Sequence, residues 1–197
     1  MESKMVKELL LQSLEHEMGG VKIYETALKC AINEDLKEEW EKYHEETEKH
    51  VQILHDVCLQ MQLDPEEQTP GRKITHDKGA ALVASMEAAL AAGDKEAAQC
   101  VACEAVTMAE LVDHSNWELI GEVAKRIGGA EGKALKAAYD EVEDEEDEHY
   151  YHSKGWMREL ALEGLGLKAV LPPPEERKHV KTAIGAARAE QERGKMR

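Results

Sequence analysis

The stretch LKAAYDEVEDEEDEHYYHSKGWMREL, residues 135–160, decides which fold we expect. Four of its residues recur every seven positions and therefore share one stripe of a helix: Leu135, Val142, His149 and Trp156. The ends of this stripe are apolar, but its middle is flanked by Glu145 and Glu146. A packed core accepts such groups only where their desolvation is compensated, and a bound metal ion would compensate it.

The same stretch holds a Glu-x-x-His motif, Glu146-Asp-Glu-His149. This spacing puts a carboxylate and an imidazole on one face of a helix, and in helical bundles such a pair projects inward to bind metal. Residues 135–160 are therefore a candidate metal-binding helix.

The composition predicts an all-α protein. The chain has 197 residues, with 5 prolines and no phenylalanine. It is rich in Ala, Leu, Glu and Lys, which favour helices, and poor in the residues that favour strands. At this length, 42% hydrophobic residues support one domain with a substantial core.

Charge and hydropathy exclude several function classes. A net charge of −16 opposes binding to nucleic acid or to an anionic membrane, because both need a basic face. The chain has neither an apolar run of membrane-spanning length nor a signal-type segment, so we expect a cytoplasmic protein. Only one Cys-x-x-Cys pair exists, Cys100 and Cys103, which argues against a rubredoxin-like or zinc-ribbon site.

Apolar periodicity and breaker residues divide the chain into helices and linkers. We expect long helices near residues 4–31, 35–62, 94–127 and 130–164, and a shorter helix at 77–92. Asp35 and Asp94 are the expected N-caps of two of these helices. Pro70 and Gly71 predict that residues 63–76 are an irregular linker.

Two of the long helices look like copies of each other. Residues 36–50, LKEEWEKYHEETEKH, align without a gap with residues 135–149, LKAAYDEVEDEEDEH. His50 and His149 therefore occupy equivalent places.

The other two long helices align as well. Glu17 precedes Tyr24 by the same seven residues that separate Glu110 from Trp117. The chain thus reads as a duplicated helical hairpin, with polar residues at the middle of each apolar seam.

This duplication predicts a two-metal carboxylate site in which all four long helices contribute ligands. Hard oxygens with one imidazole per metal suit two iron ions, or manganese, better than structural zinc. A hydrated polar core or a degenerate site is the alternative. The candidate ligands are Glu17, Glu46, His50, Glu110, His114, Glu145, Glu146 and His149.

The chain resembles the ferritin-like superfamily, which includes ferritins, bacterioferritins and rubrerythrins. The resemblance covers roughly residues 5–162. It is carried by Glu17-Met-Gly-Gly-Val-Lys-Ile-Tyr24, His44-Glu-Glu-Thr-Glu-Lys-His50 and Glu146-Asp-Glu-His149. By similarity, Glu17 and Glu110 would be terminal or bridging carboxylates, His50 and His149 would each ligate one metal, and Tyr24 would lie near the site.

The resemblance implies a ferritin-like four-helix bundle at residues 1–163. Two antiparallel hairpins would be joined by a long crossover, residues 63–93, that contains the short extra helix. Residues 164–197 would form a C-terminal proline-containing tail with a weak helix at 175–192. A homodimer through the first two helices is in keeping with the superfamily.

One position departs from the superfamily pattern. Thr47 stands where a glutamate is expected three residues before His50. Glu46 lies four residues before this histidine, on the same helical face, and can substitute. His114, four residues after Glu110, could add an imidazole or orient a ligand.

The resemblance favours a di-iron oxidoreductase that oxidises ferrous iron or reduces peroxide or dioxygen. The metals would carry the redox chemistry, and electrons would come from iron itself or from another protein. A non-catalytic metal-binding or protein-interaction bundle is the alternative from a different class.

Overall fold

The computed structural model describes residues 4–170 and residue 173. Five α-helices make up most of this part of the chain, which contains no strand, so the all-α prediction is confirmed. The helices are α1 (Lys4–Cys30), α2 (Glu34–Gln60), α3 (Pro70–Ala92), α4 (Lys95–Ala124) and α5 (Gly129–Gly164). The weak helix expected at 175–192 lies outside the described residues.

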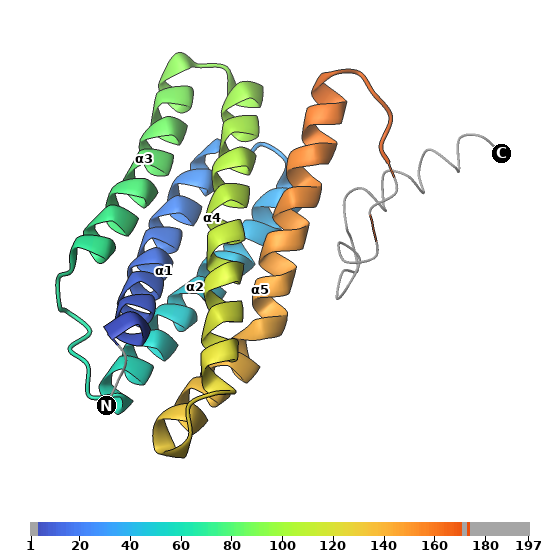
Figure 1. The fold of residues 1–197 in the computed structure, drawn as a ribbon. Coiled ribbons are helices and arrows are strands. Elements are labelled where there is room, and N and C mark those ends of the chain that lie inside the picture. Colours follow the sequence, from blue (N-terminus) through green and yellow to red (C-terminus); the bar gives the residue numbers. More distant parts are fainter. Residues whose placement is uncertain (1–3, 171–172, 174–197) are drawn as a thin grey trace.

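Four of the helices surround a shared interior, and the fifth covers it from outside (Figure 1). α1 contacts α2 and α4, and α5 contacts α4 and α2. We call these four the inner helices. α3 connects α2 to α4 and packs against α1 and α4. The inner helices are therefore close enough to present side chains from four directions to one interior.

Side-chain caps set where α2 and α4 begin. Asn33 accepts a hydrogen bond from the backbone N–H of Leu36 and is the N-cap of α2, in place of the expected Asp35. Asp94 accepts from Ala97 N–H and is the N-cap of α4, as the sequence predicted. These oxygens satisfy N–H groups that have no partner within their helices.

α3 begins seven residues earlier than Asp77, where the sequence predicted it to start. Thr69 is its N-cap, and Pro70 occupies the first turn, where a helix does not need the missing proline N–H. A Cβ added to Gly71 would meet Gln12 Nε2 at 2.3 Å. Pro70 and Gly71 therefore start this helix and bring it close to α1, rather than interrupting it.

The interior is apolar at both ends of the inner helices. At one end, Leu10, Leu54 and Leu135 belong to one buried apolar cluster. At the other end, Leu36 and Trp156 belong to a second. Between the clusters lie the charged residues described below, so the polar centre is enclosed by apolar layers.

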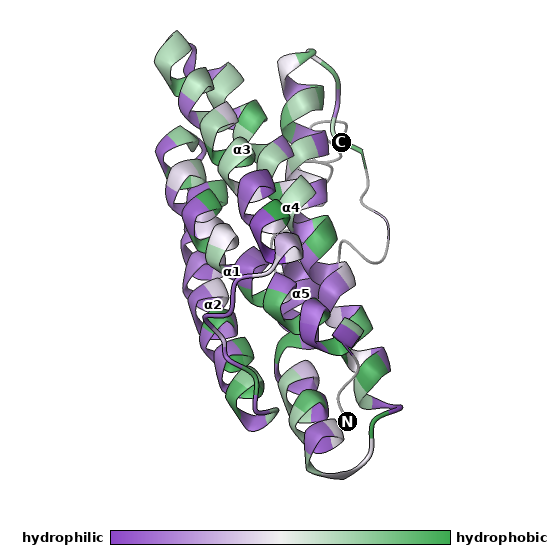
Figure 2. Cartoon of the chain, turned by 60° about the vertical axis from the view of Figure 1, so that its left-hand side comes forward, coloured by the Kyte–Doolittle hydropathy of each residue, from purple (hydrophilic) through white to green (hydrophobic). Residues whose placement is uncertain are grey.

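Hydrophilic and hydrophobic residues alternate along the helices, as Figure 2 shows. This pattern is that of amphipathic helices packed around a core. None of the helices among the described residues has both the length and the apolar character needed to cross a membrane.

A buried arginine attaches the α2–α3 connection to α1. Arg72 is 2% exposed, and its Nε donates to Glu15 Oε2 at 2.7 Å. Its Nη1 donates to the backbone oxygens of Pro65 and Glu67. One buried guanidinium thus binds a partly buried carboxylate and two carbonyls of the connection.

Arg72→Ala is expected to lower the free energy of unfolding by about 3 kcal/mol, because it removes the hydrogen bonds of a buried guanidinium to the Glu15 carboxylate and to two backbone oxygens. Urea unfolding followed by circular dichroism measures the change. Lys73→Ala is the matched control, since the neighbouring Lys73 pairs only with exposed Asp77. Equal stability of the two variants would contradict this role of Arg72.

Candidate metal centre

Six ionisable side chains from the four inner helices meet between the two apolar clusters. Each is at most 4% exposed. α1 contributes one of them, α2 one, and α4 and α5 two each. We call this group the central cluster: Glu17, His50, Glu110, Asp113, Glu146 and His149. No Lys or Arg belongs to it, so the carboxyl groups have only the two imidazoles to offset their charge.

The two histidines are held by reciprocal contacts between α2 and α5. His50 Nε2 lies 2.8 Å from Glu145 Oε2, and His149 Nε2 lies 2.9 Å from Glu46 Oε2. Each glutamate lies four residues before the histidine of its own helix and contacts the histidine of the other. A carboxylate accepts the Nε2 proton, which leaves the Nδ1 lone pair of each ring available for a metal.

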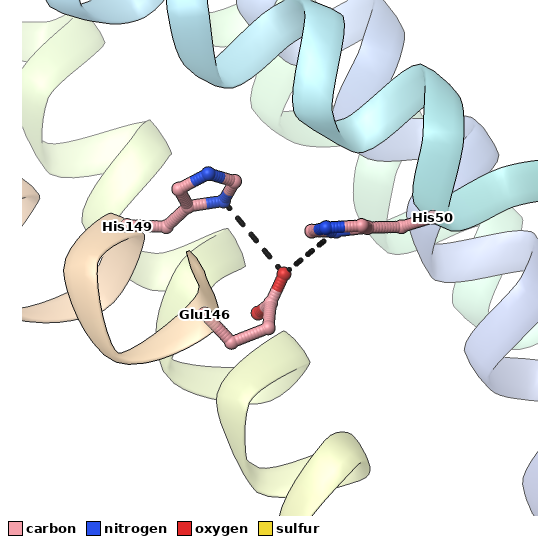
Figure 3. Close-up of side chains that lie close together, drawn as sticks. All are labelled: His50, Glu146 and His149. Carbon is pink, nitrogen blue, oxygen red and sulfur yellow. Dashed lines mark ion pairs between the residues drawn. The ribbon is translucent and has the colours of Figure 1, made fainter. Parts of the chain in front are cut away.

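Both Nδ1 atoms face Glu146, as Figure 3 shows. Glu146 Oε1 lies 3.0 Å from His50 Nδ1 and 3.7 Å from His149 Nδ1. Neither Nδ1 atom, and neither oxygen of Glu146, makes a hydrogen bond within the described part of the chain. Buried polar atoms without hydrogen bonds are uncommon, and a bound ion is one explanation for them.

Two aromatic side chains hold the glutamates of α1 and α4 in a second reciprocal arrangement. Trp117 Nε1 donates to Glu17 Oε1 at 2.8 Å, and the Tyr24 hydroxyl donates to Glu110 Oε1 at 2.7 Å. Each aromatic residue lies seven positions after the glutamate of its own helix and holds the glutamate of the other. The Oε2 atoms of Glu17 and Glu110 have no hydrogen bond among the described residues.

The symmetry breaks at two positions. The alignment that pairs His50 with His149 pairs Thr47 with Glu146, and the alignment of α1 with α4 pairs Gly20 with Asp113. Thr47 is bound locally, since its hydroxyl donates to the backbone oxygen of Tyr43. A Cβ added to Gly20 would lie 3.2 Å from Thr47 Cγ2. The half of the centre formed by α4 and α5 therefore carries two carboxyl groups, Asp113 and Glu146, that the half formed by α1 and α2 lacks.

Two sets of potential ligand atoms result. Within each set, the atoms lie within 4.8 Å of one another. One set comes from His50, Glu146 and His149, and the other from Glu17, Asp113 and Glu146. Glu146 belongs to both sets and can bridge two ions. The residues fit a pair of cations, because carboxylate oxygens and imidazole nitrogens that make no hydrogen bond among the described residues converge on two adjoining positions.

Burial shifts the pKa of the carboxyl groups in this cluster. Burial, followed by repulsion from Asp113, raises the pKa of Glu110 to about 8, against the hydrogen bond from Tyr24. Burial and repulsion from Asp113 also raise the pKa of Glu17 and of Glu146. Without metal, Glu110 therefore holds a proton at neutral pH that a cation would displace, and the upward shifts at Glu17 and Glu146 act in the same direction.

The two imidazoles are shifted in opposite directions. Burial lowers the pKa of His149, and repulsion from His50 adds to this effect, so His149 is neutral, the form that binds metal. Burial also lowers the pKa of His50, but Glu17 and the hydrogen bond to Glu145 outweigh it, and the net shift is upward.

The other candidates from the sequence occupy different places. Glu46 and Glu145 lie behind the imidazoles, where they accept hydrogen bonds from Nε2. His114 lies outside the central cluster: its ring stacks on Tyr150, and its Nδ1 is 3.6 Å from Asp147.

Asp113 is the central residue that the sequence analysis missed. Its signal was the spacing Glu110-x-x-Asp113, which puts two carboxylates on one helical face. The sequence instead predicts a role for His114, one residue later, because it lies four residues after Glu110 on the same helical face. A shift of one residue turns a side chain by about 100° around a helix, which is enough to take His114 out of the centre.

Comparison with protein-family models, with curated proteins and with solved structures found no match. A function for the centre therefore has to follow from its own residues and their geometry.

The metal-free protein is expected to lose stability as pH rises from 5 to 8. The pKa of Glu110 is 4.5 for an ordinary glutamate and about 8 in the folded chain, so across this window the folded state holds a proton that the unfolded state has released. Each such proton contributes a slope of about 1.4 kcal/mol per pH unit.

Glu110→Gln is expected to reduce this slope by about one proton. Urea unfolding at several pH values, with a chelator present, measures it. Glu104→Gln, on the exposed face of α4, is the control and should leave the slope unchanged. An identical slope in the parent and in Glu110→Gln would show that Glu110 is ionised throughout.

Proposed function

We propose that this protein is a ferritin-like di-metal carboxylate protein that oxidises ferrous iron while dioxygen or peroxide is reduced. The observation that carries the proposal is the convergence of ligand atoms without hydrogen bonds, from Glu17, Glu146, His50 and His149, in a buried interior. Buried carboxyl groups with no cationic side chain among them are costly, and divalent cations relieve that cost.

The ligand types favour iron or manganese. Carboxylate oxygens outnumber the two imidazoles, and no thiol belongs to either set of ligand atoms. Such hard donors select iron or manganese over the soft metals that thiolates prefer. Glu146, common to both sets, would hold the two ions close together.

The contacts around the ligands support a centre built for redox chemistry rather than for structure alone. When bound, the two ions would supply the electrons and the Lewis acidity for reducing an oxygen species. Trp117 and Tyr24 hold Glu17 and Glu110 through one oxygen each and leave the other oxygen to bind a cation. Pre-positioned ligands of this kind keep the geometry constant as the charge of the ions changes.

The arrangement of the inner helices supports the superfamily assignment. α1 with α2 and α4 with α5 would be the two hairpins of a ferritin-like four-helix bundle, and α3 would lie in the crossover. The reciprocal contacts of His50 with Glu145 and His149 with Glu46 are those expected of a duplicated hairpin. Homodimerisation through α1 and α2 remains part of this proposal.

A second candidate function is non-catalytic cation binding. It is favoured by the all-carboxylate set of Glu17, Asp113 and Glu146, which contains no imidazole. Carboxylate oxygens alone also suit redox-inactive divalent cations. Oxygen consumption separates the two functions.

Protein purified without chelator is expected to contain about two iron or manganese ions per chain, because two sets of ligand atoms share Glu146. Glu146→Gln should lose most of both, whereas Asp140→Asn, an exposed acid on the same helix, should keep them. Elemental analysis measures the content. If the unsubstituted protein is purified without metal and also binds no added iron, the di-metal centre is ruled out.

Ferrous iron added under air is expected to cause dioxygen consumption in proportion to the iron oxidised. An oxygen electrode and the absorbance of ferric iron measure the two together. The double variant His50→Ala/His149→Ala should lower the rate at least about tenfold, since it removes both nitrogen ligands. Stoichiometric iron binding with no oxygen uptake above the protein-free rate would favour the non-catalytic function.

A further inference from the structure

A small cavity between α4 and α5 lies between the central cluster and the protein surface. Its volume is about 50 Å³, and its lining includes Glu146 and Trp117 from the interior. Glu118 and Glu143, which are exposed, also line it. A water molecule takes up about 30 Å³ of liquid, so this space suits one or two waters or a partly dehydrated ion.

The outer part of the cavity is acidic. Glu118, Glu143 and Asp147 line it, together with His114, and no Lys or Arg is among its lining residues. His114 lies between two of these acids, with Nδ1 3.6 Å from Asp147 and Nε2 3.9 Å from Glu118. The potential at this opening therefore attracts cations.

Glu146, the residue that both sets of ligand atoms share, lines the inner end of the cavity. Glu146 is 1% exposed, and neither of its oxygens has a hydrogen bond among the described residues. A buried glutamate whose oxygens make no hydrogen bond thus lines the inner end of an acidic opening. This arrangement points to a cation rather than to a solvated acidic surface.

The wall of the opening is held in place by a glycine. A Cβ added to Gly121 would lie 2.7 Å from the Tyr139 ring, so the ring packs directly on the α4 backbone. The Tyr139 hydroxyl donates to Glu143 Oε1 at 2.7 Å. Gly121 therefore allows Tyr139 to fix the position of an acid at the opening.

The side of the centre between α2 and α5 is blocked by a lysine. Lys42 Nζ lies 2.6 Å from Glu148 Oε1 and 3.6 Å from Glu46 Oε1. Its charge offsets part of the acidic charge on that side and weakens the attraction for cations. Apolar clusters enclose both ends of the centre, so the α4–α5 cavity, with no Lys or Arg among its lining residues, is a more favourable approach for a cation than the ends or the α2–α5 side.

We propose that the α4–α5 cavity is the route by which hydrated divalent cations reach the centre. Glu118, Glu143 and Asp147 replace part of the water shell of the ion and pass it to Glu146. These residues act on the rate of loading and not on the final occupancy. This inference rests on the proposed function only in requiring that the centre bind metal.

The test compares uptake kinetics with equilibrium content, using Co²⁺ as the probe and the metal-free full chain. Stopped-flow absorbance of bound Co²⁺ gives the association rate, and elemental analysis after dialysis gives the content. The double variant Glu118→Gln/Glu143→Gln is expected to bind about tenfold more slowly at low salt with unchanged content. Because steering by charge is screened, the difference should shrink at about 1 M salt.

Glu104→Gln/Glu141→Gln is the matched control, since it removes the same charge from exposed positions on α4 and α5 away from the opening. It should load at the parent rate. Equal rates in both double variants, with normal content, would overturn the route and leave the di-metal centre standing. Reduced content in Glu118→Gln/Glu143→Gln would also overturn it, because these acids would then be ligands. A parent that binds no Co²⁺ at equilibrium would overturn the centre and the route together.

Discussion

The structure depends on one electrostatic constraint: four carboxyl groups share a buried interior with only two imidazoles. Glu17, Glu110, Asp113 and Glu146 are each at most 4% exposed. Burial removes the hydration of their ionised forms and raises the pKa of all four groups, and repulsion from neighbouring carboxylates adds to this at Glu17, Glu110 and Glu146. Protons relieve this repulsion in the metal-free chain, and cations can relieve it more strongly by bridging the carboxylates.

The surrounding contacts determine which atoms remain available. Glu46 and Glu145 each bind the Nε2 side of an imidazole, and Trp117 and Tyr24 each bind one oxygen of a glutamate. In every case the second atom of the group faces the centre without a hydrogen bond among the described residues. Because each contact joins two different helices, the same interactions that orient the ligands also fix the helices relative to one another.

Duplication explains the symmetry of these contacts, and divergence explains its loss. Thr47 and Gly20 lie where the other hairpin has Glu146 and Asp113. The result is one set of ligand atoms with two imidazoles and another with carboxylates alone. The two positions therefore differ in charge and in donor type, and ions bound there would have unequal affinities. The acidic α4–α5 cavity lies on the side of the centre that carries Glu146.

The sequence by itself determined the helical architecture and most of the polar centre, because the seven-residue periodicity shows which residues face inward. Charge at the middle of apolar seams identified Glu17, His50, Glu110, Glu146 and His149, all of which meet in the structure. Only the tertiary structure decided that Asp113 faces the centre instead of His114, and that Glu46 and Glu145 lie behind the imidazoles. Periodicity fixes the face of a side chain to within about one residue, or 100° of helix rotation, whereas these assignments depend on how neighbouring helices are rotated. The start of α3 at Pro70 has a local signal that the sequence analysis missed, a Thr69 N-cap followed by Pro70, whereas the close approach of Gly71 to α1 follows from packing.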